Sequence, residues 1–86
     1  MECIIDGKNM TARRPAHEEI AKALNFPGYY GHNLDALYDM LTAFEGTARL
    51  SGTAEMLKNL EGYGCNLLKT FYDAMEANKR FVFIAE

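Results

Sequence analysis

Two aspartates, Asp35 and Asp39, have the type and spacing that would hold a cationic group of a binding partner. They lie in a helix predicted over residues 33–44, which Asn33 can cap with its side chain. Like charges four residues apart on a helix repel by about 0.2–0.5 kcal/mol, and Asp39 is too far along the helix to gain much from its dipole. Structure alone therefore does not require the pair. An acidic solvated face that only aids solubility is the alternative.

The aspartates occupy the polar side of an amphipathic helix. Thr42 shares their side, and Tyr38 lies on its border. A second acidic pair, Asp73 and Glu76, lies on the polar side of another predicted helix, where taken alone it is an ordinary solvated face. The opposite arc of the first helix consists of Leu34, Leu37, Met40, Leu41 and Phe44.

The segment Pro-Gly-Tyr-Tyr-Gly-His at residues 27–32 is predicted to form a loop before this helix. Two adjacent tyrosines beside Gly31 suit rigid contact with a partner at low entropic cost. Because successive loop residues rarely point the same way, we expect Tyr30 to pack inward and Tyr29 to point outward.

Residues that could support catalysis or metal binding are sparse. His32 has no nucleophile or metal-ligand spacing near it, so we expect a neutral residue at the rim of the site. An enzyme using His32 with Asp35 and Asp39 as acid and base would need a cleft that so small a fold hardly has. Cys3 and Cys65 form neither a Cys-x-x-Cys pair nor a metal spacing, and we expect buried free thiols. We therefore expect no enzyme, cofactor or metal.

Charge and length narrow the class of protein further. A net charge of −3 and a pI of about 5.3 argue against direct nucleic-acid binding and favour a basic protein partner. No apolar run approaches the roughly 18 residues of a membrane span, and the start of the chain lacks the pattern of a signal peptide. We expect a cytoplasmic protein. A chain of 86 residues can close only one core, which predicts a single domain over residues 1–86.

Three segments are predicted to be strands. Residues 2–6 and 81–85 are short apolar runs, and residues 47–51 are a weaker candidate in which polar and apolar residues alternate. The first and last segments lack strict alternation, which is typical of parallel strands covered by helices.

Four helices are predicted between these strands. Pro15 is well placed at a first helical position, and Thr53 is well placed as a cap. The order β-α-α-β-α-α-β joins the strands by helical crossovers, which parallel pairing requires. We therefore expect an α/β fold with a three-stranded parallel sheet and about four helices. The helices are expected from Pro15 to Phe26, over residues 33–44, from Thr53 to near Gly62, and from beyond Gly64 to about Asn78.

The run from Pro27 to Thr42 closely resembles the signature of the barstar family. It contains Tyr-Tyr-Gly-x-Asn-Leu-Asp-Ala-Leu followed by an aromatic residue and Asp, at residues 29–39. The leading Ile-Ile-Asp-Gly, the final helix and the final apolar strand are also similar, whereas residues 45–64 match poorly. The resemblance implies a three-stranded parallel α/β protein that inhibits a secreted ribonuclease inside the producing cell.

The resemblance also implies a role for individual residues. Asp39 would take the place of a substrate phosphate, Asp35 would pair with other basic groups, and Tyr29 would cover the catalytic histidine of the nuclease. A free monomer would bind one basic, barnase-like or related ribonuclease through its acidic helix and the preceding loop. The full set expected to bind the partner is Tyr29, Gly31, Asn33, Asp35, Tyr38, Asp39, Thr42 and Asp73.

Several positions depart from the family's prototype and leave open a target other than barnase. Tyr38 and Phe44 stand where tryptophans are familiar, Gly28 and His32 stand where the prototype is acidic, and Ala77 removes another carboxylate. Because a fold does not fix a function, an immunity or regulatory protein with a partner other than a ribonuclease is the main alternative. A basic nuclease encoded nearby would favour inhibition.

Overall fold

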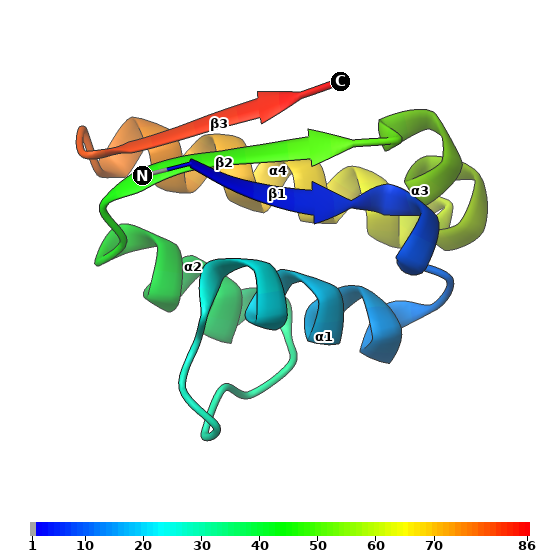
Figure 1. Ribbon diagram of the computed structural model, residues 1–86, viewed down its shortest axis with the longest axis horizontal. Coiled ribbons are helices and arrows are strands. Elements are labelled where there is room, and N and C mark those ends of the chain that lie inside the picture. The colour runs from blue at the N-terminus through cyan, green and yellow to red at the C-terminus, as the bar shows by residue number, and fades with distance from the viewer. Residues whose placement is uncertain (1) are drawn as a thin grey trace.

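The computed structural model describes residues 2–86, so Met1, the first residue of the predicted domain, lies outside the described residues. It has the predicted order of elements, with one short 3-10 helix in addition (Figure 1). The elements are β1 (Glu2–Asp6), the 3-10 helix η1 (Gly7–Asn9), α1 (Arg13–Leu24), α2 (Leu34–Thr42), β2 (Gly46–Ser51), α3 (Thr53–Leu60), α4 (Gly62–Ala77) and β3 (Phe81–Ala85).

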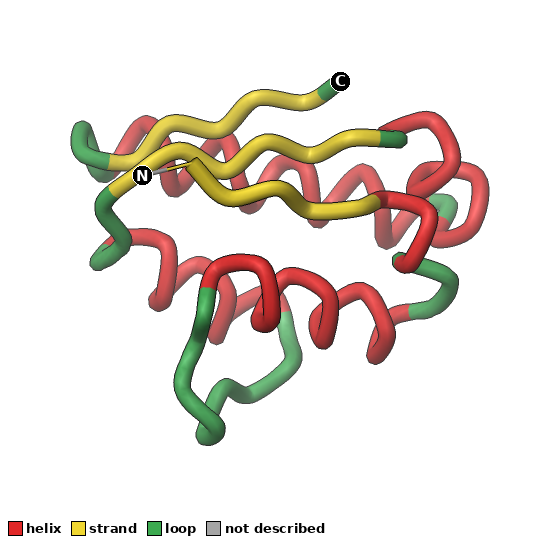
Figure 2. Tube along the Cα trace, viewed as in Figure 1, coloured by secondary structure: helices red, strands yellow, loops and turns green. Residues whose placement is uncertain are grey.

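The three strands form one parallel sheet with β2 in the centre, which confirms the predicted α/β class. The segment over residues 47–51 was the weakest strand candidate, yet it pairs with both neighbours: Ala48 lies opposite Cys3 on one side and Phe83 on the other. Helices α1, α2 and α4 lie on one side of the sheet, and α3 lies near the carboxyl ends of the strands (Figures 1 and 2).

The sheet is covered on one face, and this differs from the expectation of strands covered by helices throughout. Ile5 and Phe83 are buried beneath the helices, whereas Ile4 and Val82 point the other way and are 54% and 44% exposed. The outer strands therefore do alternate, but apolar residues on the open face hide the alternation in the sequence.

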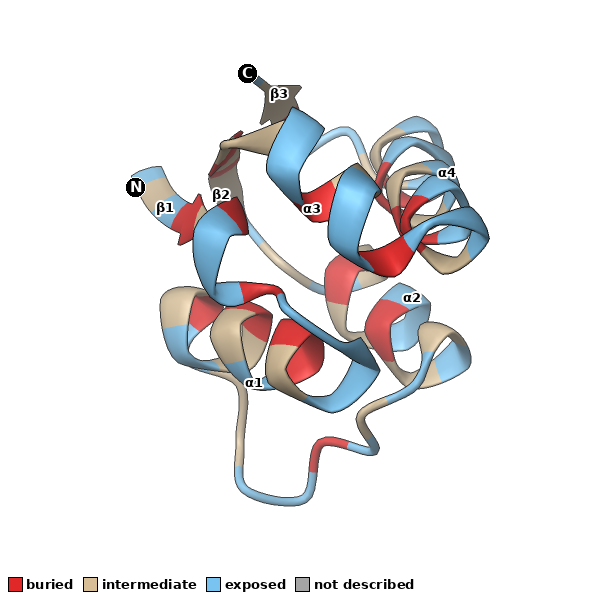
Figure 3. Cartoon of the chain, turned by 90° about the vertical axis from the view of Figure 1, so that its right-hand side faces the viewer, coloured by how far each residue is buried: buried red, intermediate tan, exposed pale blue. Residues whose placement is uncertain are grey.

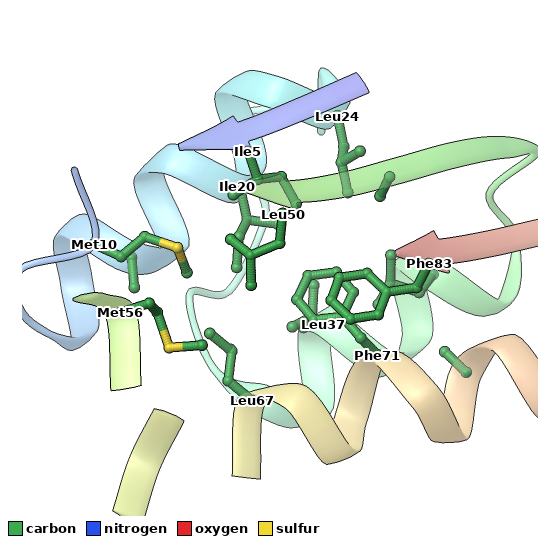
Figure 4. Close-up of a cluster of buried hydrophobic side chains, with 14 of the residues drawn as sticks. Ile5, Met10, Ile20, Leu24, Leu37, Leu50, Met56, Leu67, Phe71 and Phe83 are labelled. Atoms are coloured by element: carbon green, nitrogen blue, oxygen red, sulfur yellow. The ribbon is translucent and has the colours of Figure 1, made fainter. Parts of the chain in front are cut away.

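The core lies between the sheet and the helices, with Leu37 of α2 and Leu67 and Phe71 of α4 among its buried side chains (Figure 4). Phe71 stacks on Phe83 of β3 with ring centroids 4.3 Å apart. The helices turn their buried sides inward and leave their outer sides exposed (Figure 3). The core therefore fixes which face of each helix is left for solvent or a partner.

Three helix starts were predicted wrongly, those of α1, α3 and α4. Helix α1 begins at Arg13, so Pro15 is its third residue, a position where a proline is tolerated because the first backbone N–H groups have no partner within the helix. Thr53 is not the cap of α3: Gly52 holds that position with a left-handed φ of 74°, and the Thr53 backbone N–H donates to the Glu86 carbonyl at 2.9 Å.

Helix α4 begins at Gly62, earlier than predicted, because two glycines in its first turn weaken the helical pattern in the sequence. Its buried residues are Gly64, Leu67, Phe71 and Ala74. Cys65 falls off that arc and is exposed, and Cys3 is half-buried, so the expectation of buried thiols was wrong. Over residues 2–86, the helices are all too short or too polar to cross a membrane.

Candidate functional site

Helix α2 presents the two aspartates on a scaffold that is tied at both ends. Asn33 caps its start, where its side-chain oxygen accepts a hydrogen bond from the Ala36 N–H at 2.7 Å, as predicted. At the other end, the Asn78 side chain donates to the carbonyls of Leu41 at 3.0 Å and Phe44 at 2.8 Å. These bonds satisfy carbonyls that a helix end otherwise leaves free.

Both aspartate side chains point away from the core. Leu37 and Leu41 are fully buried, whereas Asp35 and Asp39 are exposed, as the helical spacing predicts. Among residues 2–86, neither carboxylate forms an ion pair. Their charges are therefore available to a cationic partner without the loss of an internal bond.

The loop before α2 holds its two tyrosines in opposite orientations. Tyr29 is 84% exposed and Tyr30 is 4% exposed, which confirms the expectation. The loop extends away from the side of the helices that faces the sheet (Figure 2). A Cβ atom on Gly31 would lie 3.2 Å from the Cβ of Ala36 and 3.3 Å from Nδ2 of Asn33, so a side chain there would crowd the start of α2.

A shallow hollow of about 190 Å³ joins this loop to the acidic face of α2. Tyr29 and Gly31 contribute from the loop, and Asp39 and Met40 contribute from the helix. The structure thus brings together three of the residues expected to bind a partner, an aromatic ring, a close-packed glycine and a free carboxylate.

A second hollow of about 370 Å³ lies at the start of α2 and shares no lining residue with the first. Asn33 and Asp35 line it, together with His32 and two residues that the sequence did not single out, Arg13 and Tyr63. The hollow is mixed in charge, because Arg13 and Asp35 both line it. The Arg13 guanidinium lies 4.4 Å from the centre of the Tyr63 ring.

The remaining expected residues lie outside these two hollows. Thr42 borders a third hollow at the end of α2, and its hydroxyl donates to the Asp39 carbonyl at 2.9 Å. Tyr38 is 37% exposed on the outer part of the same helix. Asp73 lies on α4, where its carboxylate forms an ion pair with Lys69 at 2.8 Å. Asp73 is therefore the expected acidic residue whose charge is already compensated.

One polar cluster beneath the loop was missed by the sequence reasoning. His17 of α1 is fully buried, and its ring nitrogens are 2.7 Å from the Tyr30 hydroxyl and 2.6 Å from the Tyr63 hydroxyl. Burial, and to a lesser extent nearby His32, lowers the pKa of His17 from 6.5 to about 4. The available signal was helical spacing, since His17 precedes Ile20 by three residues and Leu24 by seven on the buried side of α1.

The chemistry that this surface offers is recognition of a cation. Within the described part of the chain, there is no group of three His, Cys, Asp or Glu residues that could hold a metal ion. The exposed carboxylates of α2 can accept charge-assisted hydrogen bonds from a guanidinium or ammonium group, and the adjacent Tyr29 ring offers flat contact area.

Comparisons with known proteins identify the family of the chain. Residues 1–85 match the model of the family described as Barstar (barnase inhibitor). The chain is also similar to a protein of Bacillus subtilis (strain 168) named "Putative ribonuclease inhibitor YrdF", with 37% identity over 83 residues that cover 88% of this chain and 87% of that protein. The chain belongs to the barstar family.

Proposed function

We propose that this protein inhibits a ribonuclease by binding one-to-one across its active site. The observation that carries the proposal is the pair of exposed carboxylates on α2, Asp35 and Asp39, which lack an internal ion pair among residues 2–86. Asp39 also borders the hollow that the exposed Tyr29 lines. Family membership and the name of the Bacillus subtilis relative support the same role.

The proposed mechanism is occlusion by a mimic of the substrate. A ribonuclease cleft is built to hold phosphates, so a carboxylate held in place by a capped helix gains charge-assisted bonds to the same arginines. Asp39 would occupy a phosphate position, Asp35 would pair with other basic groups, and Tyr29 would cover the catalytic histidine. Gly31 and Asn33 would present backbone and fix the start of α2, and Tyr38, Thr42 and Asp73 would contact the rim.

The proposal extends to the other properties of the protein. The protein would act as an inhibitor with no catalytic activity, cofactor or metal, and would be a monomer when free. One domain over residues 1–86 would suffice for binding. A cytoplasmic location would place it where free nuclease destroys cellular RNA, and attraction between an acidic inhibitor and a basic extracellular-type ribonuclease would speed capture.

Inhibition titrations test the proposal. The protein is added to guanyl-specific ribonucleases of known concentration, and cleavage of a fluorescent RNA is followed. We expect activity to reach zero at one equivalent for at least one enzyme, and no cleavage by the protein alone. The double variant Asp35→Asn/Asp39→Asn should lose inhibition, and the control Glu18→Gln/Glu55→Gln, with the same change in charge elsewhere, should keep it. Full nuclease activity at large excess throughout the panel would instead favour an immunity or regulatory protein with another partner.

A further inference from the structure

A chain of two hydrogen bonds links the helices α1 and α4 to the loop that carries Tyr29. Tyr63 at the start of α4 contacts His17 on α1 at 2.6 Å, and His17 contacts Tyr30 in the loop at 2.7 Å. His17 is 0% exposed, and it lies 46 residues from Tyr63 and 13 residues from Tyr30 in sequence. These short hydrogen bonds join the fully buried His17 ring to a buried Tyr30 and a half-buried Tyr63, and they restrict the orientation of both tyrosine side chains.

The direction of each bond follows from the surroundings. A neutral imidazole donates from one nitrogen and accepts at the other. Tyr30 is buried, and within residues 2–86 its hydroxyl has only the His17 ring as a partner, whereas the Tyr63 side chain borders an open hollow. The Tyr30 hydroxyl therefore donates to Nδ1 of His17, Nε2–H of His17 donates to the Tyr63 hydroxyl, and the Tyr63 proton is free to bond to water. The reverse direction would leave the Tyr30 proton buried without an acceptor.

Tyr30 in turn contacts both ends of the loop. Its ring centroid is 5.0 Å from that of Phe26 and 5.1 Å from that of His32. His32 has a left-handed φ of 55°, which is uncommon for a residue with a side chain, and its ring lies against that of Tyr30. Tyr29 is 84% exposed, so its own side chain has little packing to hold it in place. The buried contacts of the adjacent Tyr30 therefore restrain the backbone of Tyr29.

Tyr63, at the other end of this series of hydrogen bonds, is also held in place. The Arg13 guanidinium covers the Tyr63 ring at 4.4 Å, and both residues border the hollow beside Asp35. Rotation of Tyr63 would therefore disturb a cation–π contact as well as a hydrogen bond.

We propose that His17 and Tyr63 are positioning residues, which fix Tyr30 through their hydrogen bonds and thereby hold Tyr29 and His32 in the conformation that binds the partner. That purpose rests on the proposed inhibition. The hydrogen bonds themselves, and their effect on the loop of the free protein, do not depend on the proposed inhibition.

The first experiment uses the free protein, so that its outcome is independent of the proposed function. Nitrogen-15 NMR at pH 7 should show His17 with the proton on Nε2, and a proton on Nδ1 would overturn the chain. Tyr63→Phe removes one hydroxyl and no ring. It should shift the amide resonances of residues 29–32 and speed their hydrogen exchange several-fold. The control is Tyr72→Phe, which removes a hydroxyl from a 45% exposed tyrosine on the same helix and should leave the loop unchanged. An unchanged loop in Tyr63→Phe would refute positioning.

The second experiment separates positioning from general stabilisation. Dissociation constants are measured against a ribonuclease inhibited in the titration, for Tyr63→Phe in the wild-type chain and in a Tyr29→Ala chain. If the bond acts through Tyr29, we expect a loss of about tenfold in the first case and less than about twofold in the second. Equal losses in both backgrounds would mean a structural role alone. Absence of any inhibited ribonuclease would refute the proposed function and leave the NMR result to decide the positioning.

Discussion

Replacement of Asp39 by alanine separates a binding role from a structural one, because the structure predicts opposite effects on affinity and on stability. The side chain is exposed, borders the hollow with Tyr29, and has no ion pair within residues 2–86. Its removal therefore breaks no internal bond of the side chain. It also relieves repulsion from Asp35, four residues earlier, which should leave the free energy of unfolding equal or raise it by about 0.2–0.5 kcal/mol.

The affinity should fall steeply. A carboxylate that takes a phosphate position makes at least two charge-assisted hydrogen bonds, each worth about 1.5–3 kcal/mol, so we expect a loss of more than about 3 kcal/mol. That loss corresponds to more than about 150-fold in Kd. A barstar aspartate is itself the standard example of an interface hot spot, so an effect of this size is expected for the family as well as from the geometry.

The assay pairs inhibition titrations with urea unfolding on three variants. Leu37→Ala is the structural control: its side chain is fully buried, and its truncation should destabilise the fold by roughly 2–5 kcal/mol. Glu55→Ala removes the same charge from α3 and should leave the affinity within about twofold of wild type. If Asp39→Ala lowered stability and left inhibition intact, Asp39 would be structural and the acidic face would not be the inhibitory surface.

Three further outcomes are expected. The association rate should fall steeply as salt shortens the Debye length below roughly 10 Å while the dissociation rate changes little, and stopped-flow data with a flat association rate would exclude electrostatic steering. Asp73→Ala should lower the binding free energy measured by calorimetry by less than about 1 kcal/mol, because the Asp73 carboxylate must exchange Lys69 for a cation of the partner. A loss as large as that of Asp39→Ala would contradict the expectation that Asp39 matters more than Asp73. The pKa of His17 is lowered from 6.5 to about 4, so between these pH values the unfolded chain binds the proton more readily than the folded protein. The contribution of His17 to stability is therefore fully present above pH 6.5 and is lost as the pH falls to 4, by up to about 3 kcal/mol. For His17→Gln, the free energy of unfolding in urea should lack this loss between pH 6.5 and 4. The same pH dependence in the variant and the wild-type protein would refute the role of His17.

The local features of the site were predictable because each depends on a few neighbouring residues. Asn33 was expected to cap α2, and its bond to the Ala36 N–H spans three residues. The orientations of Tyr29 and Tyr30 followed from alternation along a loop, and the exposure of Asp35 and Asp39 followed from helical periodicity. The expectation that these residues bind a partner came from the resemblance to the barstar family, because an acidic helix face alone is also typical of a solvated surface.

The features that escaped prediction depend on contacts between distant parts of the chain. Asn78 ends α2 from 34 and 37 residues away, and His17 contacts Tyr63 from 46 residues away. No local pattern specifies such partners, because they are set by how the helices pack on the sheet. The open face of the sheet escaped for the same reason: Ile4 and Val82 look like core residues until the positions of the helices are known.

The contrast between α2 and α4 explains why the affinity is expected to lie in one helix rather than in both. Asp73 on α4 already holds a cation, Lys69, and that hydrogen bond raises the pKa of the lysine. A partner's arginine that reached Asp73 would therefore replace one exposed ion pair with another and gain little. Asp35 and Asp39 would exchange only water for the proposed partner, and they lie on a helix whose two ends are already fixed by Asn33 and Asn78. Because the helix is ordered before binding, little conformational entropy is lost on association, and more of the electrostatic attraction remains as affinity.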